Sequence, residues 1–489
     1  MPQAIPYIAI VMSVGSAVYS MTIANNIPTQ KQTDSGTLVN KQGTNATRDV
    51  VYGRCLTGST KLYSNVDNNN SEIRLDIFTL GMSVSAIHQI LIDEVEVLDV
   101  TSSYREVGTS QDELLFSSAE LKNGYDQQCE IQIRTGMPSA ANHKLASGLY
   151  IGLPMSLAIN NSDGEWTSKM RGDNVSTVAI KTKRIIGEDE IRILGEQFTV
   201  NAEVSGQPVF DPRFSNDVDY KHYEHPTAAA KYRESGRNPA LCMLDYITNT
   251  YYGMAIPFDL IDIDSFKQTA TWCDDMSFKI DGQLNQGESF ATNIDAIAKC
   301  AGLKAVIVNG KLHLMYETAG LPSHSFDNDV NGLDNILNGS FNVKDNSTGE
   351  YINAVEIEFK NADLLDQSDT CTVPASIYPL ASSADYPSQA QIDGYLNQGN
   401  LTMPMVRIKA EDVNKQGSQV LYFANLELNR QKLQKKVSFD IDLLLDPVNV
   451  NDIIEVSNIE RKWDRKQFRI NKITSRFSEE EYSIATIEM

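Results

Sequence analysis

Residues 209–253 constrain the fold of this 489-residue chain more than any other segment, because they fix where a helix begins. Asn238 can accept backbone N–H groups as a helix cap, and Pro239 has the preset φ angle of a first helical turn. Gly253 can supply the left-handed residue that ends the helix. The apolar residues between them recur at helical spacing: Leu241, Leu244, Ile247 and Tyr251. The segment therefore predicts a short, half-buried helix.

Short apolar runs separated by polar residues precede this helix, a pattern typical of β-barrels and β-sandwiches. The runs lie at residues 73–78, 87–98, 129–134, 175–181 and 191–194. After residue 320 apolar and polar residues alternate again at residues 354–359 and 437–443. Each of these later strands should turn one face to a core and the other to water. A polar excursion at residues 361–400 and a helix at residues 419–436 are expected between them.

The period of apolar residues changes to three or four between residues 235 and 302. Helices are predicted at residues 264–274 and 289–301, and Gly302 should end the second one. Their predicted buried faces contain Phe266, Ala270 and Cys273 in the first helix, and Phe290, Ile294, Ile297, Ala298 and Ala301 in the second. Asn309-Gly310 then separates two apolar runs, which is a strong signal for a β-hairpin.

The fold predicted from these elements is α+β and mostly β, with β-barrel or sandwich domains on both sides of a smaller unit of helices and a hairpin. Four segments are expected. Residues 1–48 form an apolar arm and a polar linker, and residues 49–212 a β-rich region. Residues 213–320 form the α+β unit, and residues 321–489 a second β-rich domain with one amphipathic helix.

The N-terminal arm is unusual because no charged residue precedes Lys31. It lacks the basic region of a secretory signal, and small or polar residues interrupt its apolar run, which does not suit a spanning helix. The arm is predicted to be buried against a partner subunit or to plug an axial channel. Contact with a host membrane is the alternative.

Charge limits the partners that this chain can bind. Lys and Arg number 42 against 64 Asp and Glu, so the net charge is −22. A surface this acidic should repel duplex DNA, since binding depends on cations that neutralise phosphates. Sequence-specific nucleic-acid binding is therefore not expected. A wall past which DNA slides is compatible with the composition, because like charge prevents sticking.

The common catalytic and metal-binding motifs are missing from the sequence. It has no P-loop, nucleophile elbow or zincin helix. The six cysteines lie far apart and are expected to be mostly buried free thiols, and His222 and His225 form an isolated pair in a polar stretch. The acidic clusters at residues 93–94 and 188–190 and the Arg171-Gly172-Asp173 tripeptide are expected to be solvated turns. No catalytic residue, cofactor or metal ligand is predicted.

Aromatic and basic residues are interleaved at residues 463–469. A nucleic-acid patch is one interpretation. The favoured interpretation places Trp463 and Phe468 on either side of a tight turn, with the charges solvated.

Three ordered motifs carry a family resemblance. Val51-Tyr52-Gly53-Arg54 opens the structured region, Asp211-Pro212-Arg213 follows, and Asn238-Pro239-Ala240-Leu241 leads into the predicted helix. Together with residues 294–315 and 446–457, they resemble the tail tip attachment protein J family, the tail or baseplate hub proteins of long-tailed phages. The residues that match the family signature are Tyr52, Gly53, Arg54, Asp211, Pro212, Arg213, Asn238, Pro239 and Leu241.

The resemblance implies a structural function. Proteins of this family form a trimeric ring that caps the distal end of the tail tube, in which two tube-like β-domains per chain adapt six-fold to three-fold symmetry. The implied location is the tail tip of the virion, after synthesis in the host cytoplasm, and the ring forms the channel for DNA ejection. The implied partners are distal tail and tail-tube proteins, the tape measure protein, and fibres or receptor-binding proteins.

Two alternatives to the structural function stay open. One is a tail-associated enzyme that degrades glycan or peptidoglycan, and the other is a receptor-binding adhesin. Members of the family are usually far longer than this chain, with receptor-binding modules beyond the hub. We therefore expect this chain to supply the hub and other proteins to carry the fibres.

Overall fold

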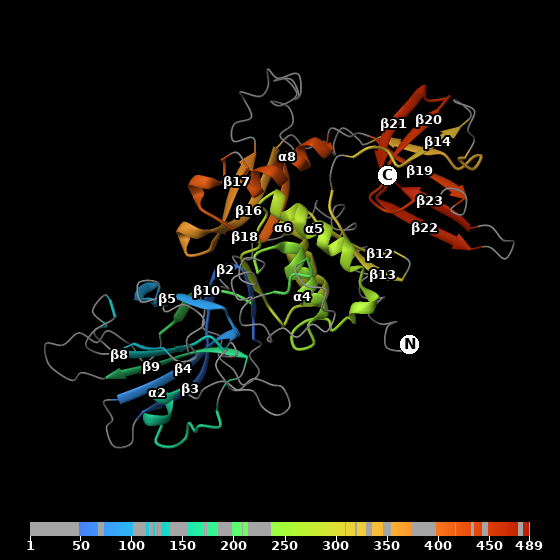
Figure 1. Ribbon diagram of the computed structural model, residues 1–489. Helices are drawn as coiled ribbons and strands as arrows, with labels where there is room; N and C mark the ends of the chain where they lie inside the picture. Colours follow the sequence, from blue (N-terminus) through green and yellow to red (C-terminus); the bar gives the residue numbers. More distant parts are fainter. Residues whose placement is uncertain are drawn as a thin grey trace.

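The structure is a computed structural model of the chain (Figure 1). It describes residues 48–66, 73–100, 114–116, 121–122, 125, 129–136, 155–170, 172, 174–183, 198–207, 209–213, 236–308, 310–317, 320–328, 335–345, 354–373, 398–415, 417–431, 435–442, 448–477 and 483–488. Several predictions fall outside these residues, namely the N-terminal arm, the strand at residues 191–194, the acidic run at residues 188–190 and the pair His222 and His225. Three main hydrophobic cores divide the described residues into an N-terminal sandwich, a central unit and a C-terminal sandwich.

The N-terminal sandwich packs a five-stranded sheet against a four-stranded one, at the lower left of Figure 1. The five-stranded sheet has the order β3-β4-β9-β8-β7, formed by Thr60–Val66, Ile73–Met82, Val175–Lys183, Cys129–Arg134 and Leu114–Phe116. The four-stranded sheet has the order β2-β10-β5-β6, formed by Arg54–Gly58, Val200–Ser205, Ala86–Ile92 and Val95–Asp99. The side chains between the sheets form one core, and α2 (Ser156–Asn160) packs on the outer face of the five-stranded sheet.

The central unit joins helices to small sheets around one core. Its helices are α4 (Pro239–Thr248), α5 (Ile263–Asp275), α6 (Phe290–Ala301) and α8 (Gln419–Gln431), with short 3-10 helices η5 (Phe258–Leu260), η7 (Ala362–Leu364) and η9 (Ala410–Asp412). Its strand pairs are β1 (Val50–Tyr52) with β11 (Gly282–Leu284), and β12 (Lys304–Val308) with β13 (Lys311–Met315). Its three-stranded sheet has the order β17-β16-β18, formed by Gln367–Val373, Ala354–Asn361 and Gln398–Ile408.

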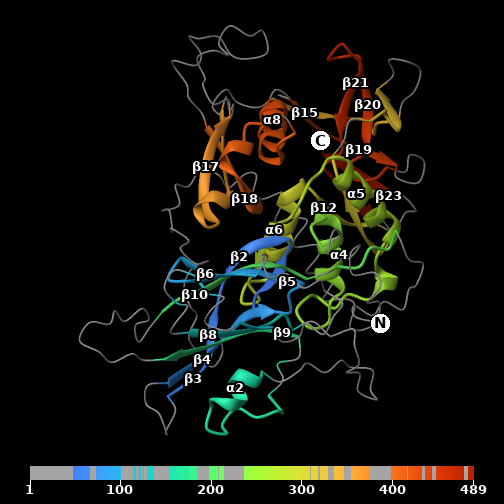
Figure 2. The same ribbon diagram turned by 60° about the vertical axis from the view of Figure 1, so that its left-hand side comes forward.

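The C-terminal sandwich packs a three-stranded sheet against a four-stranded one, at the upper right of Figure 1. The order β14-β20-β21 is formed by His324–Asn328, Ile453–Asn458 and Trp463–Arg469. The order β15-β19-β23-β22 is formed by Asn342–Asp345, Lys435–Asp442, Ser483–Glu488 and Lys472–Phe477. Phe326, Phe439 and Ile454 meet in its core. Figure 2 shows the same arrangement, with the two sandwiches on opposite sides of the central unit.

The predicted fold class is confirmed, because the chain is α+β and mostly β. The described sheets are open, those of the N- and C-terminal units face one another as sandwiches, and none closes into a barrel within the described ranges. The cores group the residues differently from the predicted boundary at residue 320. The sheet and helix of residues 354–431 complete the core of the central unit, while β14, β15 and the strands after residue 434 form the C-terminal sandwich.

Local signals explain most helix and hairpin boundaries. Ser289 caps α6 by accepting the N–H of Thr292, and Gly302 ends this helix with φ of 60°. Phe266, Ala270 and Cys273 are buried on α5 as predicted. Val308 pairs with Lys311 across the predicted hairpin, where Gly310 has a φ of 78°. In each case the local residue types agree with the tertiary packing, which makes the boundary predictable.

Four local predictions need correction. Phe290 begins α6 but is 41% exposed, because it precedes the buried face. The run at residues 87–98 is two strands joined at Asp93 and Glu94, which both have positive φ. Helix α8 ends at Gln431, and Lys435 and Lys436 belong to β19, since pairing with β15 and β23 buries the alternate residues that follow. Trp463 and Phe468 lie in one strand, β21, and not on either side of a tight turn.

Candidate functional site

Tyr52 ties strand β1 to helix α4 through a buried carboxylate. Its hydroxyl donates to Asp245 Oδ2 at 2.6 Å, and the hydroxyl of Tyr252 donates to the same oxygen at 2.6 Å. All three side chains are buried. Burial, and then the charge of Asp245, raises the pKa of Tyr52 well above its ordinary value. Hydrogen bonds to a buried carboxylate are strong, so this trio fixes β1 on the helix that the sequence predicted.

Gly53 is the point of closest approach between the first strands and the central unit. Its φ is +69°, and an added β-carbon would lie 1.9 Å from the carbonyl oxygen of Ile280. Its N–H donates to the carbonyl of Gly236 at 2.9 Å. Only glycine can adopt a left-handed conformation this close to another backbone segment.

Arg54 begins a chain of alternating charges that crosses from the N-terminal sandwich to the central unit. It binds Glu203 on β10 with two hydrogen bonds, of 2.8 and 3.1 Å. Glu203 also pairs at 3.0 Å with Arg407 on β18, and Arg407 pairs with Asp366. Burial alone would raise the pKa of Glu203, but Arg54 and Arg407 outweigh it and lower that pKa. Glu203 is therefore held ionised between two arginines from different units.

Two carboxylates from the central unit cover the free edge of β2. The N–H of Arg54 donates to Asp281 Oδ1 at 2.8 Å, and the N–H of Leu56 donates to Asp366 Oδ2 at 2.6 Å. Asp281 is itself bound by Arg237, with distances of 2.6 and 2.8 Å. Strand β2 lies at the edge of its sheet, and an uncovered edge invites pairing with another chain. These side chains close this edge and attach the sandwich to the central unit at the same time.

The two central motifs of the family signature meet on helix α5. Arg213 binds Asp211 with contacts of 2.6 and 2.8 Å, and it reaches Asp274 Oδ2 at 2.7 Å. Asn238 donates to the other oxygen of Asp274 at 2.7 Å. The hydrogen bonds to Asp211 and Asp274 raise the pKa of Arg213. Pro212 lies between the paired residues and sets the turn that brings Arg213 back to Asp211.

Helix α4 begins as predicted but is packed more completely than predicted. The side chain of Asn238 accepts the N–H groups of Ala240 and Leu241, and Pro239 occupies the first helical position. Every residue from Pro239 to Thr248 is buried, so the prediction of a half-buried helix is wrong. The central unit surrounds this helix on all sides, which a single apolar face in the sequence does not reveal.

The end of α4 also differs from the prediction. The helix stops at Thr248, and Asn249, in an extended conformation, donates its N–H to the carbonyl of Asp245. Tyr251 is 68% exposed and does not continue the buried face. Gly253 does not take a left-handed conformation. It is needed because a β-carbon there would lie 1.9 Å from the carbonyl oxygen of Tyr246.

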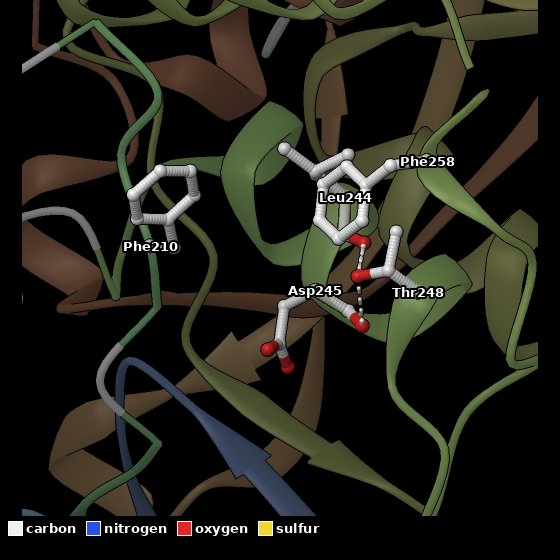
Figure 3. Close-up of a pocket in the computed structure, with 5 residues that line it drawn as sticks. All are labelled: Phe210, Leu244, Asp245, Thr248 and Phe258. Carbon is white, nitrogen blue, oxygen red and sulfur yellow. Dashed lines mark hydrogen bonds between the residues drawn. The ribbon is translucent and has the colours of Figure 1, made fainter. Parts of the chain in front are cut away.

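A small recess beside α4 offers no room for a substrate (Figure 3). Phe210, Leu244, Asp245, Thr248 and Phe258 line an empty volume of about 150 Å³, part of which is open to solvent. Ligand pockets usually span about 300–1,000 Å³. The hydroxyl of Thr248 is bonded to the carbonyl of Leu244 at 2.8 Å, and Asp245 is held by the two tyrosines. The polar groups here hold the fold together.

The described residues contain no group of three or more His, Cys, Asp or Glu side chains that could hold a metal ion. The prediction for cysteine is confirmed, since five thiols are buried, Cys371 is partly buried, and all six are free. Asp93 and Glu94 lie exposed in a turn, as expected. Among the described helices, none has the length and apolar character needed to cross a membrane.

Tyr52, Gly53 and Arg54 thus lie at the junction between the N-terminal sandwich and the central unit, whereas Arg213 and Asn238 make their contacts within the central unit. Sequence reasoning missed most of their partners, which are Glu203, Arg237, Asp245, Tyr252, Asp274, Asp281, Asp366 and Arg407. Glu203 alternates with Ala202 and Val204, as in a strand with one face in water, so its local pattern does not reveal its two arginine partners. We call this set of signature residues and partners the junction network.

Comparison with known proteins supports the fold at low sequence identity. No protein-family model matches the chain, and no curated protein matches it. Among solved structures, a chain of the virion of a native gene transfer agent particle is similar over 94% of this chain and 88% of its own length, with a TM-score of 0.57 and 8% identity. The 43 kDa tail protein of prophage MuSo2 from Shewanella oneidensis aligns over 90% of this chain and 97% of its own length, at 11% identity. Its TM-score of 0.29 is too low to indicate a common fold.

Proposed function

We propose that this chain is a structural tail hub protein of a long-tailed phage. Three copies would form a ring that caps the distal end of the tail tube, adapts six-fold to three-fold symmetry, and forms the channel for DNA ejection. The proposal locates the protein at the tail tip of the virion, after synthesis in the host cytoplasm. Its partners would be the distal tail and tail-tube proteins, the tape measure protein, and fibres or receptor-binding proteins carried by other chains.

Fold likeness supports this proposal. The similarity to a virion chain covers 94% of this chain, so it includes both sandwiches and the central unit. The ordered signature motifs resemble those of the J family along the same length. A protein with two β-sandwiches per chain can present six similar domains from three subunits, which suits the symmetry change of a hub.

The junction network is the observation that carries a structural role. Strand β1 contributes Val50 and Tyr52 to the core of the central unit and Val51 to the core of the N-terminal sandwich. Buried ion pairs and hydrogen bonds then fix the two units from both sides of this strand. A ring subunit needs such a fixed angle between its domains, because small rotations in each subunit would prevent the ring from closing.

The mass of the purified full-length chain in solution tests this proposal. One chain has a mass of 54.3 kDa, so light scattering should give three times that value, and electron microscopy should show a three-fold ring. A monomer at all accessible concentrations, or a ring of another symmetry, would contradict the proposal. We expect variants at Arg213 or Asn238 to assemble poorly, because these residues attach the segment that follows the N-terminal sandwich, and the start of α4, to helix α5.

We propose a structural and not a catalytic role for the polar residues. Incubation with peptidoglycan or host polysaccharide should release no reducing ends, and the isolated trimer should not bind whole host cells. Release of reducing ends that is lost on mutating one carboxylate pair would favour the enzyme, and cell binding would favour the adhesin. We also expect acidic residues to line the channel, since each chain carries a net charge of −22.

A further inference from the structure

The segment at residues 461–476 has a charge opposite to that of the rest of the chain. It contains seven Lys and Arg against one Asp, a net charge of +6. Since the whole chain carries −22, the other 473 residues carry −28. The segment covers β21, β22 and the turns before each of them. A basic segment on so acidic a protein is an exception that needs a physical account.

Three cations at the start of this segment are exposed and unpaired. Arg461, Lys462 and Arg465 are exposed, and no ion pair involves them within the described part of the chain. Among the described residues, exposed cations without an ion pair also occur in the central unit, at Lys279, Lys311 and Lys409, but many cations of the other units are paired. Those paired with Asp or Glu include Arg54, Lys61, Arg74, Lys122, Lys181, Arg213, Arg237, Lys267, Lys299, Arg407, Lys415 and Arg430. We call Arg461, Lys462, Arg465 and the adjacent Lys466 the basic turn.

The backbone holds the basic turn in a fixed shape. The buried side chain of Asn458 accepts the N–H of Arg461 at 3.0 Å, and the hydroxyl of Ser457 accepts the N–H of Arg465 at 3.0 Å. Lys462 and Arg465 both have positive φ, of 56° and 50°. Such a conformation is costly for residues with a β-carbon, so the surrounding bonds must impose it. The backbone that carries these exposed cations is thus ordered before any partner binds, which lowers the entropy cost of binding.

The aromatic residues of this region do not form a platform for bases. Phe468 is buried, and the ring of Trp463 is covered by Phe341, Phe468 and Lys466. Single-stranded nucleic acid binds through stacking on free aromatic faces, which are missing here. Duplex binding relies on neutralising many phosphates, and four cations on a chain of net charge −22 make a weak site. An acidic protein surface is the partner that this chemistry favours.

Strand addition is also disfavoured as the mode of contact. β21 lies at the edge of its sheet. Its pairing with β20 shifts register between Val456 and Asn458 of β20, and Lys466 projects from β21 itself. Bulges and lysines on an edge strand block pairing with another strand. Contact must therefore be made through charged side chains, and salt should weaken it.

We propose that the basic turn docks on an acidic surface of a second copy of this chain and helps to close the ring. The inference rests on the proposed trimer and names one of its contacts. The other 473 residues, at −28, provide the complementary charge in each neighbouring subunit. In both views the β20–β21 hairpin lies at the top of the C-terminal sandwich, away from the N-terminal sandwich (Figures 1 and 2). A contact between two different surfaces of identical chains is head-to-tail, and such contacts form rings when the rotation closes.

A charge-reversal experiment with a matched control tests this contact. The patch variant combines Arg461→Glu, Lys462→Glu and Arg465→Glu in the full chain. The control combines Lys279→Glu, Lys311→Glu and Lys409→Glu, three other exposed cations, so both variants change the net charge equally. Mass is measured by sedimentation and light scattering over a range of concentrations at about 0.05 and 0.5 M salt, which screens exposed charges strongly. The patch variant should dissociate at least tenfold more readily than the control, and the wild-type trimer should weaken at high salt.

Cross-linking identifies the partner surface. A zero-length amine–carboxylate reagent is applied to a mixture of light and heavy-isotope chains, so that links between copies are recognised by mass. Links from Lys462 or Lys466 to Asp or Glu of another copy are expected. The inference is overturned if the patch variant and the control assemble equally, or if the patch instead proves necessary for binding duplex DNA and not for assembly. In either case a trimeric wild type would leave the proposed function intact, whereas a monomeric wild type would contradict that function itself.

Discussion

Alanine at Gly53 should loosen the junction far more than alanine at Gly310, although both glycines are left-handed. Their φ angles are +69° and +78°, so the strain of a β-carbon in this conformation, about 1–2 kcal/mol, is common to both variants. Their surroundings differ. A β-carbon at Gly53 would lie 1.9 Å from the carbonyl oxygen of Ile280 and 2.4 Å from Asp281 Oδ1, whereas no atom lies within 4 Å at Gly310.

The size of the difference follows from this overlap. Because real β-carbons do not approach other atoms within 3.0 Å, the chain at Gly53 must move by about 1 Å relative to Ile280. A shift of this size breaks the bond from Gly53 to Gly236 and the bond from Arg54 to Asp281. Each buried hydrogen bond lost costs about 1–3 kcal/mol. The free energy of unfolding should therefore fall by about 2–6 kcal/mol more in Gly53→Ala than in Gly310→Ala.

The three tryptophans allow the result to be read unit by unit. Trp166 lies in the N-terminal sandwich, Trp272 in the central unit and Trp463 in the C-terminal sandwich. In backgrounds that keep one tryptophan and replace the others by phenylalanine, urea unfolding is followed by fluorescence. Gly53→Ala should lower the midpoints at Trp166 and Trp272 and leave that at Trp463 unchanged. Equal midpoints for the two alanine variants at Trp272 would refute the close-packing explanation.

Three further changes test other contacts. Asn238→Ala should lower the free energy of unfolding at Trp272 by about 1–3 kcal/mol, more than Ser289→Ala, because Asn238 both caps α4 and binds Asp274. Burial alone would raise the pKa of Glu317, but Arg430, Lys304 and Arg469 outweigh it and lower that pKa. A lowered carboxyl pKa adds stability that is lost as pH falls. The urea midpoint of Glu317→Gln should therefore lie furthest below that of the wild type at about pH 7, and the difference should narrow below pH 4.5. Burial raises the pKa of Cys129 and Cys273 to about 12, so a thiol reagent should label Cys371 first, as read by mass spectrometry of tryptic peptides.

Elements with a complete local signal were predictable from the sequence. Helix α6 has its cap at Ser289, its apolar face and its stop at Gly302 within 14 residues, and the structure agrees with all three except for the exposed Phe290. The β12–β13 hairpin has its turn residues between two alternating runs. In both cases local propensity and tertiary packing favour the same conformation, so the sequence pattern is sufficient.

Elements that depend on distant partners were not predictable. The end of α8 at Gln431 follows from the pairing of β19 with β15 and β23, which lie about 90 residues before it and 45 after it in the sequence. The complete burial of α4 follows from packing against α5, α6 and the strands around them. A hydrophobic pattern reports how many faces an element can bury, but other segments decide how many faces it does bury.

The junction network shows why signature residues were recognisable when their roles were not. Tyr52, Gly53 and Arg54 are adjacent in sequence, but their side chains or backbone bind residues 193, 183 and 149 positions away, at Asp245, Gly236 and Glu203. No local pattern links such positions. Strand β1 gives the one clue, since three apolar residues in succession indicate a strand with both faces buried. In this fold the two faces enter two different cores, so β1 cannot shift without disturbing both units. A rotation of the N-terminal sandwich would therefore have to break the Arg54–Glu203–Arg407 bridge and the contacts of β1 together, so these two sets of contacts reinforce each other in fixing the domain angle.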